Sequence, residues 1–148
     1  LFGCTPLSSL APDLTTYGRE TFAPFPAKVV VDGLELPYRL FGAINAGSMD
    51  INIGNVIRVF GLARPTGKLH LQAGGIPPED MILNLWNLWR GNKIVSKQLY
   101  DAPGECMEIY PQEGTHLHPV IDGELFHNVS WAKVTLGPKI AIPKVVAA

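Results

Sequence analysis

Residues 27–44 read AKVVVDGLELPYRLFGAI and predict a β-hairpin, from which the rest of the fold can be worked out. The β-branched run at residues 27–31 favours a strand, and Asp32-Gly33 is one of the commonest two-residue hairpin turns. Apolar residues then recur through residues 34–44, which predicts the returning strand, and Pro37 within it indicates an edge or a bulge. The stretch therefore predicts antiparallel strand pairing.

The rest of the chain repeats this pattern of short apolar runs separated by turn residues. Turn signals recur about every eight to twelve residues, which is typical of antiparallel sandwiches and barrels. We therefore expect a mainly β fold, an antiparallel β-sandwich or barrel-like domain with one covering α-helix. The further strands are expected at residues 49–53, 56–60, 68–73, 94–100, 106–110, 117–121, 131–136 and 140–146, with a turn at residues 101–104.

One helix is predicted, over residues 78–90. Pro78 occupies the first turn and Gly91 follows the last turn, positions that both residues favour. We expect the apolar face of this helix to cover an open end of the sheet, and the alternative is contact with a partner domain or with lipid headgroups. That face carries residues at spacings of three and four, namely Ile82, Leu85, Trp86 and Trp89.

The length of 148 residues is that of one domain, which can bury about two thirds of its unfolded surface. Residues 1–26 contain four prolines and predict an extended lead-in, and residues 27–148 are expected to form the domain. The chain opens on Leu1-Phe2-Gly3 without a methionine, and we interpret it as a fragment of a longer protein.

Composition excludes several classes of function. The formal net charge of −1 gives no basic surface for nucleic acid, so we expect no nucleic-acid partner. The two cysteines, Cys4 and Cys106, are far apart and are expected to be reduced thiols. No apolar stretch approaches the roughly 20 residues that span a bilayer. We therefore expect a cytoplasmic protein whose only membrane contact is peripheral.

An acidic turn follows the apolar pair Val120 and Ile121, which predicts a buried strand. Gly123 permits a positive φ, so the chain can turn sharply and project Asp122 and Glu124 from one corner. Two carboxylates this close can share a proton, a metal ion or a substrate hydroxyl. The alternative is a solvated hairpin turn, because Asp-Gly is common there.

Three histidines lie around this turn and give a metal-site hypothesis. His116 and His118 are two residues apart, which places both on one face of a strand, and His127 follows the turn. Asp122 and Glu124 between them would add oxygen ligands. The alternative is that all three are loop histidines exposed to water.

Four segments of the chain resemble the diacylglycerol kinase and sphingosine kinase superfamily of lipid kinases. The runs VIDGEL at residues 120–125 and LGPKIAIPKV at residues 136–145 are similar to the C-terminal segment of that family. The runs FGLARPTGKLHLQAGG at residues 60–75 and LWNLWRGNK at residues 85–93 are similar to the strand and the short helix that precede the acidic turn in bacterial members. The resemblance covers most of the chain, from Ala27 onward.

The resemblance implies a β-sandwich that folds over an N-terminal nucleotide-binding domain, whose GGDGT loop binds ATP. It implies that Glu124 is, or assists, the base that takes the proton from a lipid hydroxyl, and that Asp122 supports Glu124 or a magnesium ion. The implied partners are the lipid substrate, the N-terminal domain and a membrane surface. ATP and Mg²⁺ are implied for the full-length protein, and no cofactor for this chain alone.

The sequence departs from the family in two places. No GGDGT loop is present, and no other set of glycines forms a phosphate-binding loop. The Asp-Asp-Gly turn of many members is also missing, since Ser48-Met49-Asp50 matches it poorly. We therefore expect this chain alone to be inactive. A non-catalytic β-sandwich module that binds a membrane or a protein is the alternative function.

Overall fold

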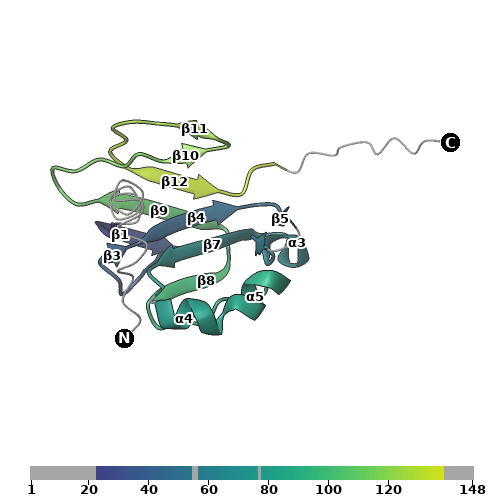
Figure 1. Cartoon of the computed structure of the whole chain (residues 1–148). Helices are drawn as coiled ribbons and strands as arrows, with labels where there is room; N and C mark the ends of the chain where they lie inside the picture. Colours follow the sequence, from purple (N-terminus) through teal and green to yellow (C-terminus); the bar gives the residue numbers. More distant parts are fainter. Residues whose placement is uncertain (1–22, 55–56, 77, 139–148) are drawn as a thin grey trace.

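The computed structural model describes residues 23–54, 57–76 and 78–138, and this part of the chain is a mainly β domain (Figure 1). Every strand pair within it is antiparallel, which confirms the expected fold class. Most of the predicted lead-in and the predicted strand at residues 140–146 lie outside the described residues. The strands are β1 (Phe25–Val31), β2 (Leu34–Glu35), β3 (Leu40–Phe41), β4 (Ala43–Gly47), β5 (Ile51–Ile53), β6 (Ile57–Val59), β7 (Leu69–Gly74), β8 (Leu99–Gly104), β9 (Cys106–Pro111), β10 (Val120–Ile121), β11 (Glu124–Leu125) and β12 (Ala132–Thr135), and the helices are α3 (Ala63–Thr66), α4 (Pro78–Leu83) and α5 (Leu85–Arg90).

The first sheet has the strand order β12-β9-β1-β2, and β3 pairs with the first residues of β1. Side chains alternate along β1, where Val29 and Val31 are buried and Lys28 between the apolar positions is exposed. In the register with β9, Val29 lies opposite Ile109 and Val31 lies opposite Met107. The period of two residues therefore turns the apolar side of this sheet toward the core.

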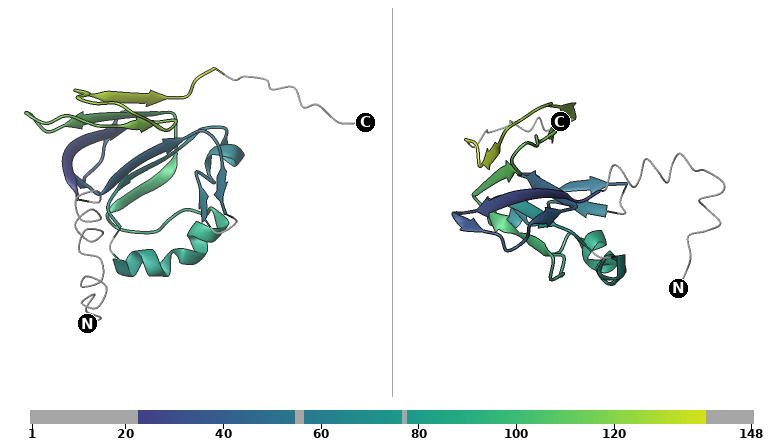
Figure 2. Two further views of the ribbon diagram at one scale, coloured as in Figure 1. Left: turned by 45° about the horizontal axis from the view of Figure 1, so that its top comes forward. Right: turned by 90° about the vertical axis from the view of Figure 1, so that its left-hand side faces the viewer.

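The second sheet has the order β4-β7-β8 and shares one core with the first (Figure 2). Leu69 and Leu71 of β7 are buried in this core, as their alternation predicts. Burying each large apolar side chain contributes about 1.5–3 kcal/mol to folding. The largest fully buried apolar side chains in the described residues come from both sheets, namely Val29, Phe41 and Met107 of the first and Leu71 of the second.

Asp32 joins the β1–β2 turn to the corner where the chain passes from β8 to β9. Asp32 and Gly33 have φ angles of 49° and 83°, as the predicted two-residue hairpin turn requires. One oxygen of Asp32, Oδ1, accepts hydrogen bonds from the backbone N–H groups of Glu105 (2.9 Å) and Cys106 (2.8 Å). These two bonds link segments more than 70 residues apart.

We expect Asp32→Ala to lower the free energy of unfolding by roughly 1–3 kcal/mol, because two backbone N–H groups lose their acceptor. Asp122→Ala is the matched control, since Asp122 has a similar φ of 51° and also precedes a glycine, but its carboxylate has no partner among the described residues. Urea unfolding of both variants measures the difference. An equal loss in both would mean that the two hydrogen bonds of Asp32 add nothing.

The structure corrects the boundaries of one predicted strand and turn. Residues 101–104, predicted as a turn, form the last four residues of β8, and the expected strand at residues 94–100 begins only at Leu99. Pro103 is tolerated because β8 pairs only with β7 among the described strands, so Pro103 lies on an edge. The backbone N–H groups of Ile94 and Val95 bond instead to the side chains of Asp101 and Asn84.

The predicted helix at residues 78–90 is two short helices, α4 and α5, which are separated at Asn84. Gly91 ends α5 with a φ of 68°, as predicted. The expectation that the apolar face covers the sheet is wrong, because Ile82, Leu85 and Trp86 are 57–68% exposed. Asn84 is instead the buried residue, at 4% exposure. No described helix has the length and apolar character that crossing a membrane requires.

Candidate functional site

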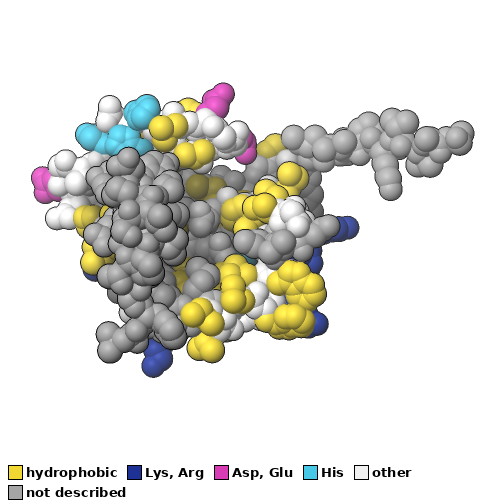
Figure 3. All heavy atoms as spheres, viewed as in Figure 1, with side chains coloured by type: hydrophobic (Ala, Val, Ile, Leu, Met, Phe, Trp, Pro, Cys, Tyr) yellow, Lys and Arg dark blue, Asp and Glu magenta, His cyan; other side chains and the backbone are white. Residues whose placement is uncertain are grey.

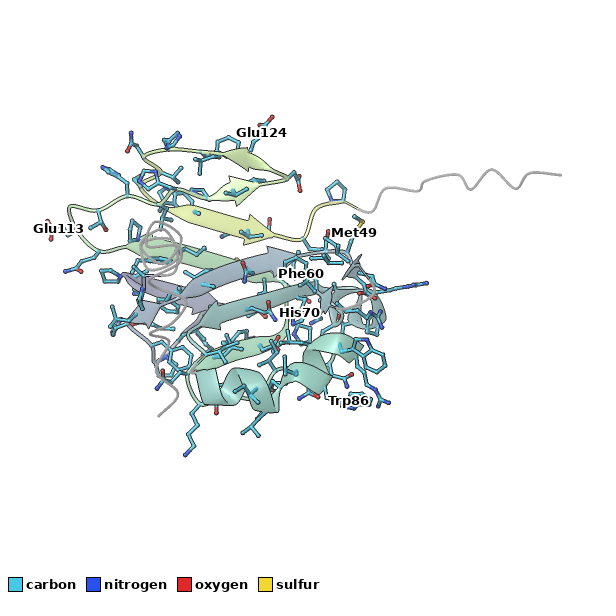
Figure 4. All side chains as sticks on the ribbon, viewed as in Figure 1. Met49, Phe60, His70, Trp86, Glu113 and Glu124 are labelled. Carbon is cyan, nitrogen blue, oxygen red and sulfur yellow. The ribbon has the colours of Figure 1, made fainter. Side chains whose placement is uncertain are left out.

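The acidic turn forms the tip of the β10–β11 hairpin. Ile121 pairs with Glu124 across the hairpin, and the turn between them is Asp122-Gly123. Asp122 and Gly123 have φ angles of 51° and 91°, so the predicted sharp turn is confirmed. Figure 4 shows Glu124 at the outer edge of the domain, with its side chain directed away from the sheets.

Both carboxylates of the turn are exposed and free. Neither Asp122 nor Glu124 makes an ion pair or side-chain hydrogen bond within the part of the chain that the structure describes. Glu35 shows the contrast, since its carboxylate contacts Lys28 (3.0 Å) and Arg39 (2.7 Å). Those contacts, that of Lys28 first, lower the pKa of Glu35 below its ordinary value of 4.5. The turn carboxylates are therefore available to a group from outside the domain.

The base of the hairpin is held by backbone hydrogen bonds. Leu117 and Val129 exchange two of them, at 2.8 and 3.0 Å, and the N–H group of Phe126 donates to the Pro119 carbonyl at 2.9 Å. Leu117 is buried and belongs to the core cluster. The hairpin is thus anchored at its base while its tip extends into solvent.

The prediction of a buried strand before the turn is wrong. Val120 and Ile121 are 66% and 55% exposed, and Leu125 opposite them is 53% exposed. A hairpin of two residues per strand pairs with no other described strand, so it has no second layer to bury these side chains. The tip of the hairpin therefore combines two free carboxylates with an exposed apolar flank.

The histidine hypothesis gains one contact. The rings of His118 and His127 meet edge to face with centroids 5.5 Å apart, and all three histidines, His116 included, are exposed, as the alternative expects. Among the described residues no group of three or more His, Cys, Asp or Glu side chains is placed to hold a metal ion. The geometry therefore supports a histidine pair and gives no set of ligands that includes Asp122 and Glu124.

A buried imidazole–carboxylate pair between β7 and β8 is absent from the sequence-based candidates. His70 and Asp101 are 2% and 1% exposed, and His70 Nε2 is hydrogen-bonded to Asp101 Oδ1. Gln72 donates to the same oxygen, at 3.3 Å, and the N–H of Ile94 donates to Asp101 Oδ2. Figure 4 shows Phe60 beside His70, and the two rings pack edge to face.

This pair has a structural role. The backbone N–H of Leu62 donates to His70 Nδ1 (3.4 Å), so both ring nitrogens have partners. No buried side-chain nitrogen or oxygen in the described residues lacks a hydrogen-bond partner. A substrate could reach neither side chain without breaking this network. No pattern in the sequence indicates this pair, because alternation predicts His70 on the polar face of its strand and the residues after Tyr100 predict a turn that contains Asp101.

An uncharged groove runs along the second sheet. Its walls include the apolar side chains of Leu40, Ile94 and Leu99 and the amides of Asn45 and Gln72. No charged residue lines it among those described. Such a lining suits an apolar chain rather than a phosphate or a metal ion.

Comparison with known proteins adds no relative to these observations. No family model matches the sequence, and no curated protein matches it either. The functional interpretation therefore depends on the residues and on their arrangement.

Proposed function

We propose that this chain is the C-terminal, substrate-side domain of an ATP-dependent lipid kinase that phosphorylates a lipid hydroxyl, diacylglycerol-like or sphingoid. The observation that carries the proposal is the contrast between the two Asp-Gly turns. The carboxylate of Asp32 is bound to two backbone N–H groups of its own domain, whereas those of Asp122 and Glu124 have no partner in the described residues. Free carboxylates at a hairpin tip are available to act on a group brought by a partner.

Glu124 is the proposed base. Its carboxylate can accept the proton of a lipid hydroxyl as that oxygen attacks a phosphoryl group, once the two oxygens are about 2.6–3.2 Å apart. Asp122, two residues away, adds a second negative charge at the same tip. That charge favours the protonated form of Glu124 after transfer and can attract a metal ion.

The chain supplies only part of the chemistry that a kinase needs. It has no glycine-rich loop that could hold the phosphates of a nucleotide. ATP would therefore bind to an N-terminal nucleotide-binding domain of the longer protein. Magnesium commonly takes only one or two protein carboxylates together with substrate phosphates, and the two free carboxylates of the turn fit that need. When bound, Mg²⁺ neutralises the charge of the transferred phosphoryl group.

Two observations support a lipid as the substrate. They are the uncharged groove of the second sheet and the resemblance of the acidic turn to that of lipid kinases. Apolar walls with a few amide groups match an acyl chain and a neutral head group. The proposed partners are therefore a lipid substrate, a nucleotide-binding domain and a peripheral membrane surface.

The direct test is phosphoryl transfer by the longer protein that contains this chain. We expect labelled phosphate from ATP to appear in diacylglycerol or sphingosine, only with Mg²⁺ present, and we expect none in glycerol or a soluble sugar. Thin-layer separation of the lipid products measures the transfer. Absence of label from every lipid hydroxyl would rule out the proposal.

The second candidate is a non-catalytic β-sandwich that binds a membrane or a protein. The exposed apolar residues of α4 and α5 favour it, because soluble domains rarely display several large apolar side chains together. The two candidates differ in Glu124. Only the kinase proposal gives this residue a chemical role.

A further inference from the structure

The outward side of α4, α5 and the residue Val95 forms an ordered apolar surface, called here the α4–α5 face. Figure 3 shows hydrophobic side chains gathered over these helices, at the end of the domain away from the β10–β11 hairpin in Figure 1. Its members are 47–79% exposed, namely Ile82, Leu83, Leu85, Trp86, Trp89 and Val95.

Asn84 fixes this surface in place. Its side chain donates to the Val95 carbonyl (2.9 Å) and accepts from the Val95 N–H (2.9 Å) and from Asn87 (3.0 Å). Ile94 next to Val95 is buried, at 5% exposure. Because the polar side chain of Asn84 occupies the inward position, Ile82, Leu83, Leu85, Trp86 and Trp89 are left on the outward side, while Leu88 is half-buried. Their exposure is therefore a property of the fold.

The free positive charges of the domain gather around the same face. Five described Lys and Arg side chains form ion pairs with carboxylates. Residues 82–98 contain three cations and no acidic residue, and the nearest described carboxylates along the chain are Asp80 in α4 and the buried Asp101 in β8. The described cations without an ion pair all lie on α3, on α5 or just after α5, namely Arg64, Arg90, Lys93 and Lys97.

The aromatic residues of the face are arranged as in an interfacial helix. The rings of Trp86 and Trp89 pack together with centroids 4.8 Å apart, and the Arg90 guanidinium lies 4.3 Å from the Trp86 ring centroid. Tryptophan favours the boundary between headgroups and acyl chains, and arginine can keep its charge at the headgroup level. Apolar and cationic groups on one short helical surface match both parts of an anionic bilayer.

We propose that the α4–α5 face docks on a bilayer that contains anionic phospholipid. Docking through this face stands apart from the proposed function, because it needs only a bilayer and the residues of the α4–α5 face and no reaction at Asp122 or Glu124. The described cations without an ion pair favour an anionic phospholipid surface over a second copy of this chain, whose matching face would carry the same positive charge. Figure 1 places the β10–β11 hairpin, which carries Asp122 and Glu124, at the other end of the domain from α4 and α5. The docking surface is therefore separate from the proposed catalytic turn.

Vesicle co-sedimentation of the 148-residue chain tests the proposal. We expect binding to vesicles of phosphatidylcholine with phosphatidylglycerol and weak binding to phosphatidylcholine alone. Replacing both Trp86 and Trp89 by alanine should lower the partition coefficient on the order of 100-fold, since two large side chains leave the bilayer. Trp131→Ala is the matched control, because Trp131 is 51% exposed and lies on the segment before β12.

Charge has its own pair of variants. Replacing both Lys93 and Lys97 by glutamine should reduce binding to the anionic vesicles by roughly 10- to 30-fold, because the two lysines contribute about equally to the electrostatic attraction between the protein and the surface. Lys28→Gln with Lys133→Gln removes the same charge from the first sheet and should leave binding nearly unchanged. All replaced side chains are exposed, so an unchanged unfolding midpoint is expected for each variant and confirms that it is folded.

Fluorescence locates the contact without removing a residue of the face. The Trp131→Phe chain retains only Trp86 and Trp89, and its emission should shift to the blue and be quenched by brominated lipids on vesicle addition. The chain with Trp86→Phe and Trp89→Phe should show neither change. Three results would each overturn the proposal. They are a fluorescence change of Trp131 alone, vesicle binding that is unchanged when both Trp86 and Trp89 are replaced, and a dimer that dissociates on Trp86→Ala.

The docking surface and the proposed catalytic turn can be tested apart. In the longer protein, the double tryptophan variant should lose vesicle binding but keep the wild-type turnover of a short-chain lipid dissolved in water. If the wild-type protein binds vesicles and the double tryptophan variant does not, docking is supported even when no kinase activity is found. Vesicle binding by the longer protein that does not change when both tryptophans are replaced would contradict docking and leave the proposed function unaffected.

Discussion

Asp101→Ala is expected to lower the free energy of unfolding by roughly 3–5 kcal/mol, the usual cost of removing one partner from a buried polar pair. The substitution leaves three groups without their acceptor, namely the His70 ring nitrogen, the Gln72 amide and the Ile94 N–H. Asp101 is 1% exposed, so water cannot replace these bonds without opening the domain. A loss of this size is a large fraction of the 5–15 kcal/mol that typically stabilises a domain.

Denaturant unfolding of three variants separates the hydrogen bonds from the volume of the side chain. Asp101→Asn keeps the shape of the side chain and one acceptor oxygen, so its loss should lie between those of wild type and Asp101→Ala. Glu113→Ala, at an exposed site without a side-chain partner in the described residues, should change stability by less than about 0.5 kcal/mol. If Asp101→Ala were no more costly than Glu113→Ala, the buried network would not stabilise the fold.

Local features could be predicted from the sequence where the backbone conformation favours one residue type. Both Asp-Gly pairs form the turns predicted for them, because glycine accepts a positive φ and aspartate tolerates one. The antiparallel class was predictable because turn signals recur between short apolar runs, and the β-branched residues of β1 predicted a strand there. Gly91 likewise ends α5, since the left-handed residue after a helix is most often glycine.

Hydrogen bonds between distant residues could not be predicted from the sequence. They account for the wrong predictions about the α4–α5 helices and about residues 101–104. The helix period shows that α4 and α5 have an apolar face but not which face turns inward. Asn84 decides this by bonding to Val95, 11 residues away. Asp101 likewise bonds to His70, 31 residues away, and its place in a strand could not be predicted from the local sequence DAPG. Nothing in either local pattern specifies its partner.

The candidate site was predictable as a turn but not as an exposed hairpin. Apolar Val120 and Ile121 indicated a buried strand, yet the hairpin that they form has no sheet layer over it. Neither the Asp122 nor the Glu124 side chain makes a hydrogen bond or ion pair in the described residues. Their roles must therefore be tested by measuring activity, because replacing them should not change stability.

Glu124→Gln in the longer protein should therefore lower the turnover of lipid by about 10²–10⁴-fold, the range that general base catalysis contributes. Glutamine keeps the size and hydrogen-bonding shape of glutamate but cannot accept the hydroxyl proton at neutral pH. Because Glu124 is exposed and its carboxylate has no partner in the described part of the chain, the unfolding midpoint should not fall. The loss should appear in kcat with little change in KM, since the proton moves only in the chemical step.

Two further variants assign the loss to the turn. Glu113→Gln removes the same charge from the loop after β9, which Figure 4 places on another side of the domain from Glu124, and its turnover should equal that of wild type. Asp122→Asn should lower turnover less than Glu124→Gln, because it removes a supporting charge but leaves the proposed base. Full turnover in Glu124→Gln would remove the acidic turn from the mechanism, whereas equal losses in all three variants would point to the net charge of the domain instead of a base at Glu124.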